Sequence, residues 1–222
     1  MYPLKRLTIL CGHYGSGKTN VAVNIAAELK KSREIVTVAD LDIVNPYFRT
    51  KDSAAYFEEQ GIRLICSAYA NSNVDIPALP QEMYAITDDR SMTAVLDIGG
   101  DDRGALVLGR LAPKILAEGD YEMLMVINCY RPLTRDAAST LEVMAEIEYA
   151  GGIRFTGLVN NSNLGAVTTA EDILASRDYA EEVARLSGLP IVMTSVRQDL
   201  YSAVVGKVHN AFPLGLQKNK YL

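Results

Sequence analysis

The chain has 222 residues, a length that fits one α/β domain or at most two small ones. It carries 22 Lys and Arg against 27 Asp and Glu, and the resulting net charge of −5 argues against general affinity for nucleic acid or an anionic membrane surface. Apolar residues make up 49% and charged residues 22%, which excludes disordered, collagen-like and coiled-coil classes.

Three cysteines, Cys11, Cys66 and Cys129, lie far apart in apolar runs without a CxxC pair or a nearby histidine cluster. This pattern predicts reduced thiols and excludes a disulfide framework or a zinc site. The N-terminal apolar stretch is too short for a signal peptide, and no run of 18 apolar residues that would span a membrane occurs in the sequence. We therefore expect a cytoplasmic protein.

Apolar runs of strand length alternate with helix-length amphipathic segments, the pattern of a parallel sheet with crossover helices. The runs are almost continuously Val, Ile, Leu and Met, which predicts strands that are covered on both faces. The predicted strands are Leu7–Cys11, Ile35–Asp40, Arg63–Ser67, Thr93–Ile98, Met123–Asn128, Phe155–Asn160 and Pro190–Thr194.

Amphipathic helices are predicted over Lys18–Lys31, over Leu133–Tyr149, and from Thr169 to Ser187. Thr169 with Asp172 has the spacing of a capping box. The inner stripe predicted for the second helix comprises Leu133, Ala137, Thr140, Met144 and Ile147. Because we find no repeat or linker, we predict a single α/β domain over residues 1–222, with a doubly wound, mostly parallel sheet and helices on both faces.

The strongest motif follows the first predicted strand and opens the first predicted helix. It satisfies GxxxxGK[ST], a match that arises by chance in roughly one chain in a hundred of this length. Glycines let backbone N–H groups turn toward phosphate oxygens, and the helix adds the positive end of its dipole. We expect the motif and the residue after it to bind a nucleotide: Gly12, His13, Tyr14, Gly15, Ser16, Gly17, Lys18, Thr19 and Asn20. Lys18 would neutralise the β and γ phosphates, and the Thr19 hydroxyl would ligate Mg²⁺.

Two other strand ends supply carboxylates. Asp97 ends an apolar run and is followed by Gly99 and Gly100, as expected of a Walker B carboxylate that reaches Mg²⁺ directly or through water, next to a segment that moves when phosphate leaves. Asp40 and Asp42 come at the carboxyl end of the second predicted strand, where ligands of parallel sheets bind. Asp42 would position the attacking water, and Asp40 would support Lys18 or the metal shell.

The phosphate loop, the DxD at residues 40–42 and the DxGG at residues 97–100 together resemble the MinD/ParA group of P-loop ATPases, which includes the nitrogenase iron protein and CobQ/CobB-type domains. The resemblance extends from Leu7 to about Val205. It implies binding of ATP and Mg²⁺, slow hydrolysis, and an ATP-dependent homodimer that acts on a protein partner, here unidentified. It also implies that Asp42 belongs to switch I and that Asp97, Gly99 and Gly100 belong to switch II.

By the same resemblance, residues 157–162 match the segment whose asparagine contacts the adenine amino group. An Asn amide offers both the donor and the acceptor that an adenine edge needs. Asn160 and Asn161 are the two candidates in this segment, and we favour Asn161. Val196 and Arg197 would flank the base.

One position departs from the group, whose phosphate loop carries a signature lysine that reaches the nucleotide of the partner subunit. Here that position is His13, and Tyr14 replaces the next glycine. Either His13 takes a weaker, pH-dependent version of the lysine's role, or it supplies only its backbone N–H to the loop.

The leading functional hypothesis is an ATP-driven dimerisation switch, with the Pro-bearing segments 45–49 and 72–80 either at an interface or packed on their own domain. The alternative is an ATP-dependent biosynthetic ligase or small-molecule kinase, with a second basic pocket formed by Arg49, Arg103 and Arg131. A third is a regulator that binds ATP and hardly hydrolyses it. The C-terminal residues 205–222 contain two glycines and a proline, which excludes a continuous amphipathic membrane helix there.

Overall fold

The computed structural model describes residues 2–41, 53–66, 81–99 and 102–215, with only the backbone described at residues 81, 102 and 103. These residues form one sheet whose strands are β1 (Leu7–Cys11), β2 (Val36–Leu41), β3 (Arg63–Cys66), β4 (Thr93–Ile98), β5 (Tyr121–Ile127), β6 (Gly157–Asn160), β7 (Ile191–Arg197) and β8 (Ala211–Leu214). The helices are α1 (Lys18–Lys30), α2 (Ala54–Gln60), α3 (Gln81–Asp88), α4 (Asp102–Glu118), α5 (Ala137–Gly151), α6 (Ala170–Ala175), α7 (Arg177–Ser187) and α8 (Tyr201–Val204).

The strand order is β3-β2-β4-β1-β5-β6-β7-β8, and every neighbouring pair is parallel. The seven predicted strands are confirmed, with ends that shift by three residues or fewer. The eighth strand, β8, was missed because it is short and contains Pro213. A proline is tolerated there since β8 lies at the edge of the sheet.

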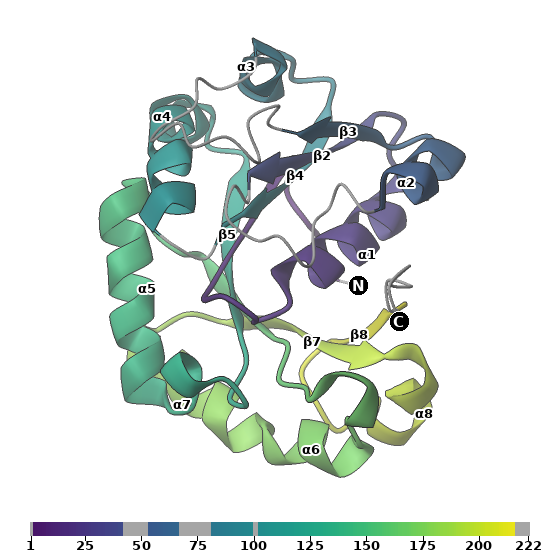
Figure 1. Cartoon of the computed structure of the whole chain (residues 1–222), viewed down its shortest axis with the longest axis vertical. Coiled ribbons are helices and arrows are strands. Elements are labelled where there is room, and N and C mark those ends of the chain that lie inside the picture. Colours follow the sequence, from purple (N-terminus) through teal and green to yellow (C-terminus); the bar gives the residue numbers. More distant parts are fainter. Residues whose placement is uncertain (1, 42–52, 67–80, 100–101, 216–222) are drawn as a thin grey trace.

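Helices cover both faces of the sheet, as predicted (Figure 1). One apolar cluster joins the sheet to α3, α4, α5 and α7, and a second joins it to α1 and α2. Successive strand residues alternate between the two: Leu96 and Ile98 belong to the first cluster, whereas Val95 belongs to the second. This alternation directs the side chain of Asp97 to the α1 side of the sheet.

The helix predicted from Leu133 is shorter at its N-terminus than expected. Residues 132–134 form a single 3₁₀ turn, and α5 begins at Ala137, where the Asp136 carboxylate accepts the N–H of Ser139 at 2.9 Å. Leu133 is therefore outside the helix and 55% exposed, so its place on the inner stripe was wrong. An N-cap outweighed the apolar spacing that favoured an earlier start.

The helix predicted after Thr169 is broken into α6 and α7. The Thr169–Asp172 capping box is confirmed. The break comes at Ser176, whose hydroxyl donates to the carbonyl oxygen of Ile173 at 2.8 Å and accepts from the amide of Asn160 at 3.0 Å. A serine side chain that bonds the preceding turn competes with the helix backbone, which explains the interruption.

None of the three cysteines forms a disulfide within the described part of the chain. Cys11 is buried in β1, and burial raises the pKa of its thiol although nearby Lys18 opposes the shift. Cys129 lies just beyond β5 and is partly exposed. In the part of the chain described by the structure, no helix combines the length and apolar character needed to cross a bilayer.

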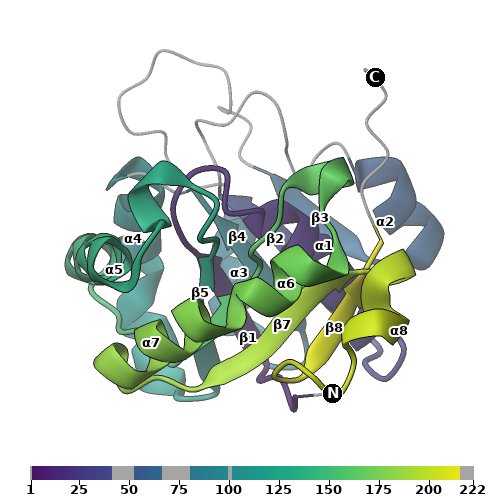
Figure 2. The same cartoon turned by 90° about the horizontal axis from the view of Figure 1, so that it is seen from below.

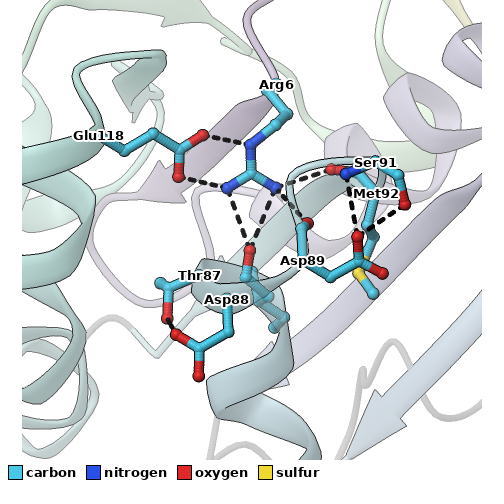
Figure 3. A network of polar contacts seen from close by, with 8 residues as sticks. Arg6, Thr87, Asp88, Asp89, Ser91, Met92 and Glu118 are labelled. Atoms are coloured by element: carbon cyan, nitrogen blue, oxygen red, sulfur yellow. Dashed lines mark hydrogen bonds and ion pairs between the residues drawn. The ribbon is translucent and has the colours of Figure 1, made fainter.

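The amino-terminal edge of the sheet contains a buried ion pair between Arg6 and Glu118 (Figure 3). Both Nε and Nη2 of Arg6 contact the Glu118 carboxylate. The other donors reach the main chain in the last turn of α3 and just after it: Nη1 lies 3.1 Å from the carbonyl oxygen of Ile86, 3.2 Å from that of Asp89 and 2.7 Å from that of Met92. One guanidinium thus joins the start of β1, the end of α3 and the end of α4.

Candidate functional site

The loop between β1 and α1 is shaped by glycines whose α-carbons leave no room for a side chain. Gly12 (φ 148°) packs on the carbonyl oxygen of Val126, and Gly17 (φ 88°) packs on the amide nitrogen of Asn161, so a β-carbon at either position would collide. The loop closes on itself through Ser16 N–H, which donates to the carbonyl oxygen of His13 at 3.1 Å. The loop arches over the carboxyl-terminal ends of the strands, which are uppermost in Figure 2.

Lys18 and Thr19 begin α1, and both side chains are buried. Lys18 Nζ donates to the carbonyl oxygens of Gly12 at 3.0 Å and His13 at 3.4 Å, so the ammonium group lies across the loop. Thr19 Oγ1 donates to Oδ2 of Asp97 at 2.7 Å. Two motifs that are 78 residues apart in the sequence therefore meet at the first turn of α1.

Asp40 and Asp97 are register partners on the neighbouring strands β2 and β4, and both are buried. Their strand neighbours pack into the cluster on the opposite face, so both carboxylates face the α1 side. Among the residues that the structure describes, no group of three or more His, Cys, Asp or Glu side chains is arranged to hold a metal ion. A hydroxyl paired with a carboxylate beside a phosphate loop nevertheless fits Mg²⁺, which takes few protein ligands and completes its shell with phosphate oxygens and water.

Asn161, the residue predicted to contact the base, is buried and bonded inside the protein. Its Nδ2 donates to the carbonyl oxygen of Ser16 at 2.6 Å, and its Oδ1 accepts from the hydroxyl of Ser195. It therefore ties the phosphate loop to β7. Asn160 instead donates to Ser176 and faces the junction of α6 and α7, so of the two asparagines only Asn161 contacts the loop among the bonds described.

Two further asparagines, which sequence reasoning missed, hold the neighbouring loops. Asn128 is buried at the end of β5, and its Oδ1 accepts the N–H groups of Tyr130 at 3.0 Å and Asn163 at 3.3 Å. Asn163 in turn donates to the carbonyl oxygen of Asn161 at 2.7 Å. The signal available in the sequence was an asparagine at the end of an apolar run, where amides commonly bond to adjacent turns.

Arg131, which the sequence linked only to the alternative function, lies directly on the phosphate loop. Its Nε donates to the carbonyl oxygen of Gly15 at 2.8 Å. The residue caps the 3₁₀ turn at 132–134, and its own N–H donates to the carbonyl oxygen of Asn128 at 3.1 Å. The structure thus brings this guanidinium to the site from the segment after β5.

Val196 and Arg197, the other two residues predicted to contact the base, use their side chains inside the protein. Val196 is buried with Ile173 and Val204 in a small apolar cluster, so its side chain belongs to the core and only its backbone is left to face a base. Arg197 forms an ion pair with Asp199, with Nε 2.6 Å from Oδ1, and its Nη1 donates to the carbonyl oxygen of Ala166 at 2.6 Å. That arginine joins the loops after β6 and β7.

The remaining predicted loop residues have local partners. His13 Nδ1 lies 3.0 Å from the carbonyl oxygen of Tyr14, and the Tyr14 side chain is 54% exposed. Asn20 accepts from Asn24 through its carbonyl oxygen at 2.7 Å. The Ser16 hydroxyl is buried and has no hydrogen-bond partner among the described residues, which leaves a donor inside the loop for a ligand.

Gly99 follows β4 and is packed against α4. A β-carbon on Gly104 would lie 2.5 Å from the carbonyl oxygen of Gly99, so the first turn of α4 can approach only because residue 104 is glycine. Asp42, Gly100 and the segments 45–49 and 72–80 fall outside the described residues.

No family model and no curated protein matches this chain. Solved structures do match. The chain has the fold of a P-loop nucleoside triphosphatase. The cell division protein FtsY of Thermotoga maritima is 18% identical over 85% of this chain and 60% of its own, with a TM-score of 0.55. FtsY of Mycoplasma mycoides is 16% identical over 85% and 59%, with a TM-score of 0.52.

The 54 kDa signal recognition particle protein of Aeropyrum pernix K1, solved in complex with GDP, is 15% identical over 87% of this chain and 41% of its own, with a TM-score of 0.51. The chain therefore spans about three fifths or less of the length of these proteins. At these identities the comparisons describe the fold, and the resemblance to the MinD/ParA group stays a hypothesis drawn from motif order.

Proposed function

We propose that this chain is a Mg²⁺-dependent nucleoside triphosphatase that binds ATP, hydrolyses it slowly, and uses the cycle to switch a homodimer that acts on a protein partner. The observation that carries the proposal is the hydrogen bond of 2.7 Å between Thr19 and Asp97. It joins the phosphate-loop motif to the Walker B-like motif at the first turn of a helix, where the helix dipole favours anions.

Each residue then has a distinct task. Lys18 neutralises phosphate charge, and Thr19 with Asp97 holds Mg²⁺ directly or through water, supported by Asp40. When bound, Mg²⁺ would supply Lewis-acid chemistry that offsets the charge developing on the phosphate during transfer. Asp42 positions water, and the Gly99–Gly100 segment responds to the departing phosphate.

The choice of base is the least constrained part of the proposal. ATP follows from the resemblance to the MinD/ParA group, whereas the matching Aeropyrum protein was solved with GDP, which makes guanine the competing base. We propose that Asn161 contributes to the base site from its position between the phosphate loop and β7. Arg197 and the backbone at Val196 border the same site.

The decisive experiment measures the binding of fluorescent ATP and GTP analogues to the wild type and to Lys18→Ala. We expect binding by the wild type and a loss of at least about tenfold in the variant, because a charge-assisted contact to phosphate disappears. Lys207→Ala is the matched control, since Lys207 is exposed and its ammonium group, among the described residues, bonds only to the carbonyl oxygen of Ala203. A wild type that binds neither nucleotide would overturn the proposal.

Hydrolysis and dimerisation need separate assays. Phosphate release should require Mg²⁺, and light scattering should show a dimer with ATP and Mg²⁺ that is lost with ADP. A monomer in both states would remove the switch and leave the triphosphatase.

One observation favours the alternative, an ATP-dependent ligase or small-molecule kinase with a second basic pocket. Of the three arginines considered for that pocket, Arg131 is the one whose side chain is described, and it lies on the phosphate loop. Turnover of ATP that is stimulated by small carboxylates would support the alternative, whereas a macromolecular activator would support the switch.

A further inference from the structure

Arg131 is held against the phosphate loop in a defined orientation. Its Nε donates to the carbonyl oxygen of Gly15 at 2.8 Å, and a β-carbon on Gly15 would lie 3.5 Å from that nitrogen and 3.7 Å from Cδ. The Arg131 backbone bonds on both sides, to Asn128 and to Thr134, at 3.1 Å each. The guanidinium plane is thus positioned by one nitrogen before any ligand arrives.

The charge of Arg131 is not compensated within the described part of the chain. No carboxylate there lies within ion-pair distance of it, and its Nη1 and Nη2 make no hydrogen bond to a described residue. Two other arginines near this edge differ: Arg135 pairs with Asp136, and Arg197 pairs with Asp199. Arg131 is a half-buried cation whose side chain bonds to a neutral carbonyl of the phosphate loop. A cation in such a position favours the binding of an anionic ligand.

We infer that Arg131 contacts the phosphate chain of a bound nucleotide through Nη1 and Nη2, as a second fixed cation beside Lys18. The inference rests on the proposed nucleotide binding. A guanidinium presents N–H donors that match the oxygens of a phosphate, and with Nε on the Gly15 carbonyl oxygen the two Nη groups make no bond to a described residue. Arg131 comes from the segment after β5, so it acts in cis and needs no partner subunit.

The test compares two probes, a fluorescent nucleoside triphosphate and inorganic tripolyphosphate, by equilibrium titration or calorimetry. Arg131→Gln should weaken both by a similar factor of about 10 to 100, the range expected for hydrogen bonds to a charged group. Arg131→Lys keeps the charge but loses the fork, so its loss should be intermediate. Arg135→Gln is the matched control, because it removes a guanidinium four residues away that is exposed and already paired.

Each outcome bears on the assignment. Unchanged affinity of Arg131→Gln for tripolyphosphate would overturn it, and so would a loss confined to the nucleoside triphosphate, which would place Arg131 at the base or ribose. If Arg131→Gln does not fold, as judged by the loss of a cooperative unfolding transition, Arg131→Lys becomes the test. An Arg131→Lys variant that binds both probes as tightly as the wild type would overturn the assignment. A wild type that binds tripolyphosphate but no nucleotide would instead refute the proposed function and leave the phosphate contact of Arg131 standing.

Discussion

Two arginines lie at opposite ends of the strands, Arg6 at the amino-terminal ends (the amino edge) and Arg131 at the carboxyl-terminal ends (the carboxyl edge), and they make different kinds of contact. At the amino edge, Arg6 is 9% exposed, and its nitrogens reach one carboxylate and three carbonyl oxygens. At the carboxyl-terminal ends of the strands, Arg131 bonds to described residues through Nε alone, on a neutral carbonyl of the phosphate loop. Described residues therefore satisfy the first arginine, whereas the second is the one that we propose to bind phosphate.

The surroundings of the two arginines differ in the same way. The amino edge is closed by a buried ion pair, which is costly to break because it would leave a lone charge in the interior. The carboxyl edge is held by short neutral amides and hydroxyls, notably Asn128, Asn161 and Ser195. These neutral hydrogen bonds hold the loops next to Lys18 and Arg131, whereas a charged pair holds the opposite ends of the strands.

The largest expected effect comes from Arg6→Met. Removing the guanidinium leaves the buried Glu118 carboxylate unpaired, and we expect the free energy of unfolding to fall by about 3–5 kcal/mol in chemical denaturation. Nucleotide affinity of the folded fraction should not change. The matched control is Lys114→Met, because the Lys114–Asp88 pair is about half exposed on both sides and should be worth less than about 1 kcal/mol. Similar losses for the two variants would contradict the contrast between buried and exposed pairs.

Gly17→Ala should have the next largest effect, at the carboxyl edge. The new β-carbon would meet Asn161 at a residue with φ 88°, so we expect a loss of roughly 2–3 kcal/mol together with weakened nucleotide binding. Two causes contribute to this loss, the contact with Asn161 and the strain of a positive φ. Gly188→Ala tests the strain alone, because Gly188 has φ 73° but open space around its α-carbon. If the two variants unfold at the same denaturant concentration, backbone strain alone accounts for the effect.

Asn161→Ala should cost about 1–2 kcal/mol, because the Ser16 carbonyl loses its donor and the Ser195 hydroxyl keeps only its longer bond, 3.3 Å, to the carbonyl oxygen of Asn160. It should also weaken nucleotide binding, since the loop loses its tie to β7. Asn160→Ala removes two side-chain hydrogen bonds, one to Ser176 between α6 and α7 and one from the N–H of Ser162. We expect that variant to lose stability and keep its nucleotide affinity; equal loss of affinity in both would refute the distinction between these neighbours.

The smallest effect is expected for Glu122→Gln at the amino edge. Glu122 is 2% exposed, and burial raises the pKa of its carboxyl although Lys5 N–H and the Thr8 hydroxyl each donate to it at 3.0 Å. A raised pKa means that the folded state favours the protonated form, so the wild type loses stability as the pH rises through that pKa. The free energy of unfolding of Glu122→Gln, measured relative to that of the wild type in urea, should therefore increase from pH 4 to pH 7. Glu146→Gln, on the exposed side of α5, should show no such trend.

Local patterns predicted much of the fold and the centre of the site. The seven predicted strands followed from continuous apolar runs, and the phosphate loop followed from glycines and a lysine at fixed spacing. The start of α5 and the break at Ser176 were missed because single capping and side-chain bonds outweigh apolar periodicity at helix ends. Strand β8 escaped because its proline is acceptable only at an edge, and position in the sheet is not visible in a short segment.

By itself the sequence predicted which segments would bind phosphate and placed Asp97 near the end of a buried strand. Only the tertiary structure decided which segments meet. With β4 on one side of β1 and β5 on the other, Asp97 reaches Thr19 while the segment after β5 brings Arg131 to Gly15. Strand order depends on hydrogen bonds and packing between residues far apart in the chain, so the Arg131 contact has no local signature, whereas the glycine loop has one.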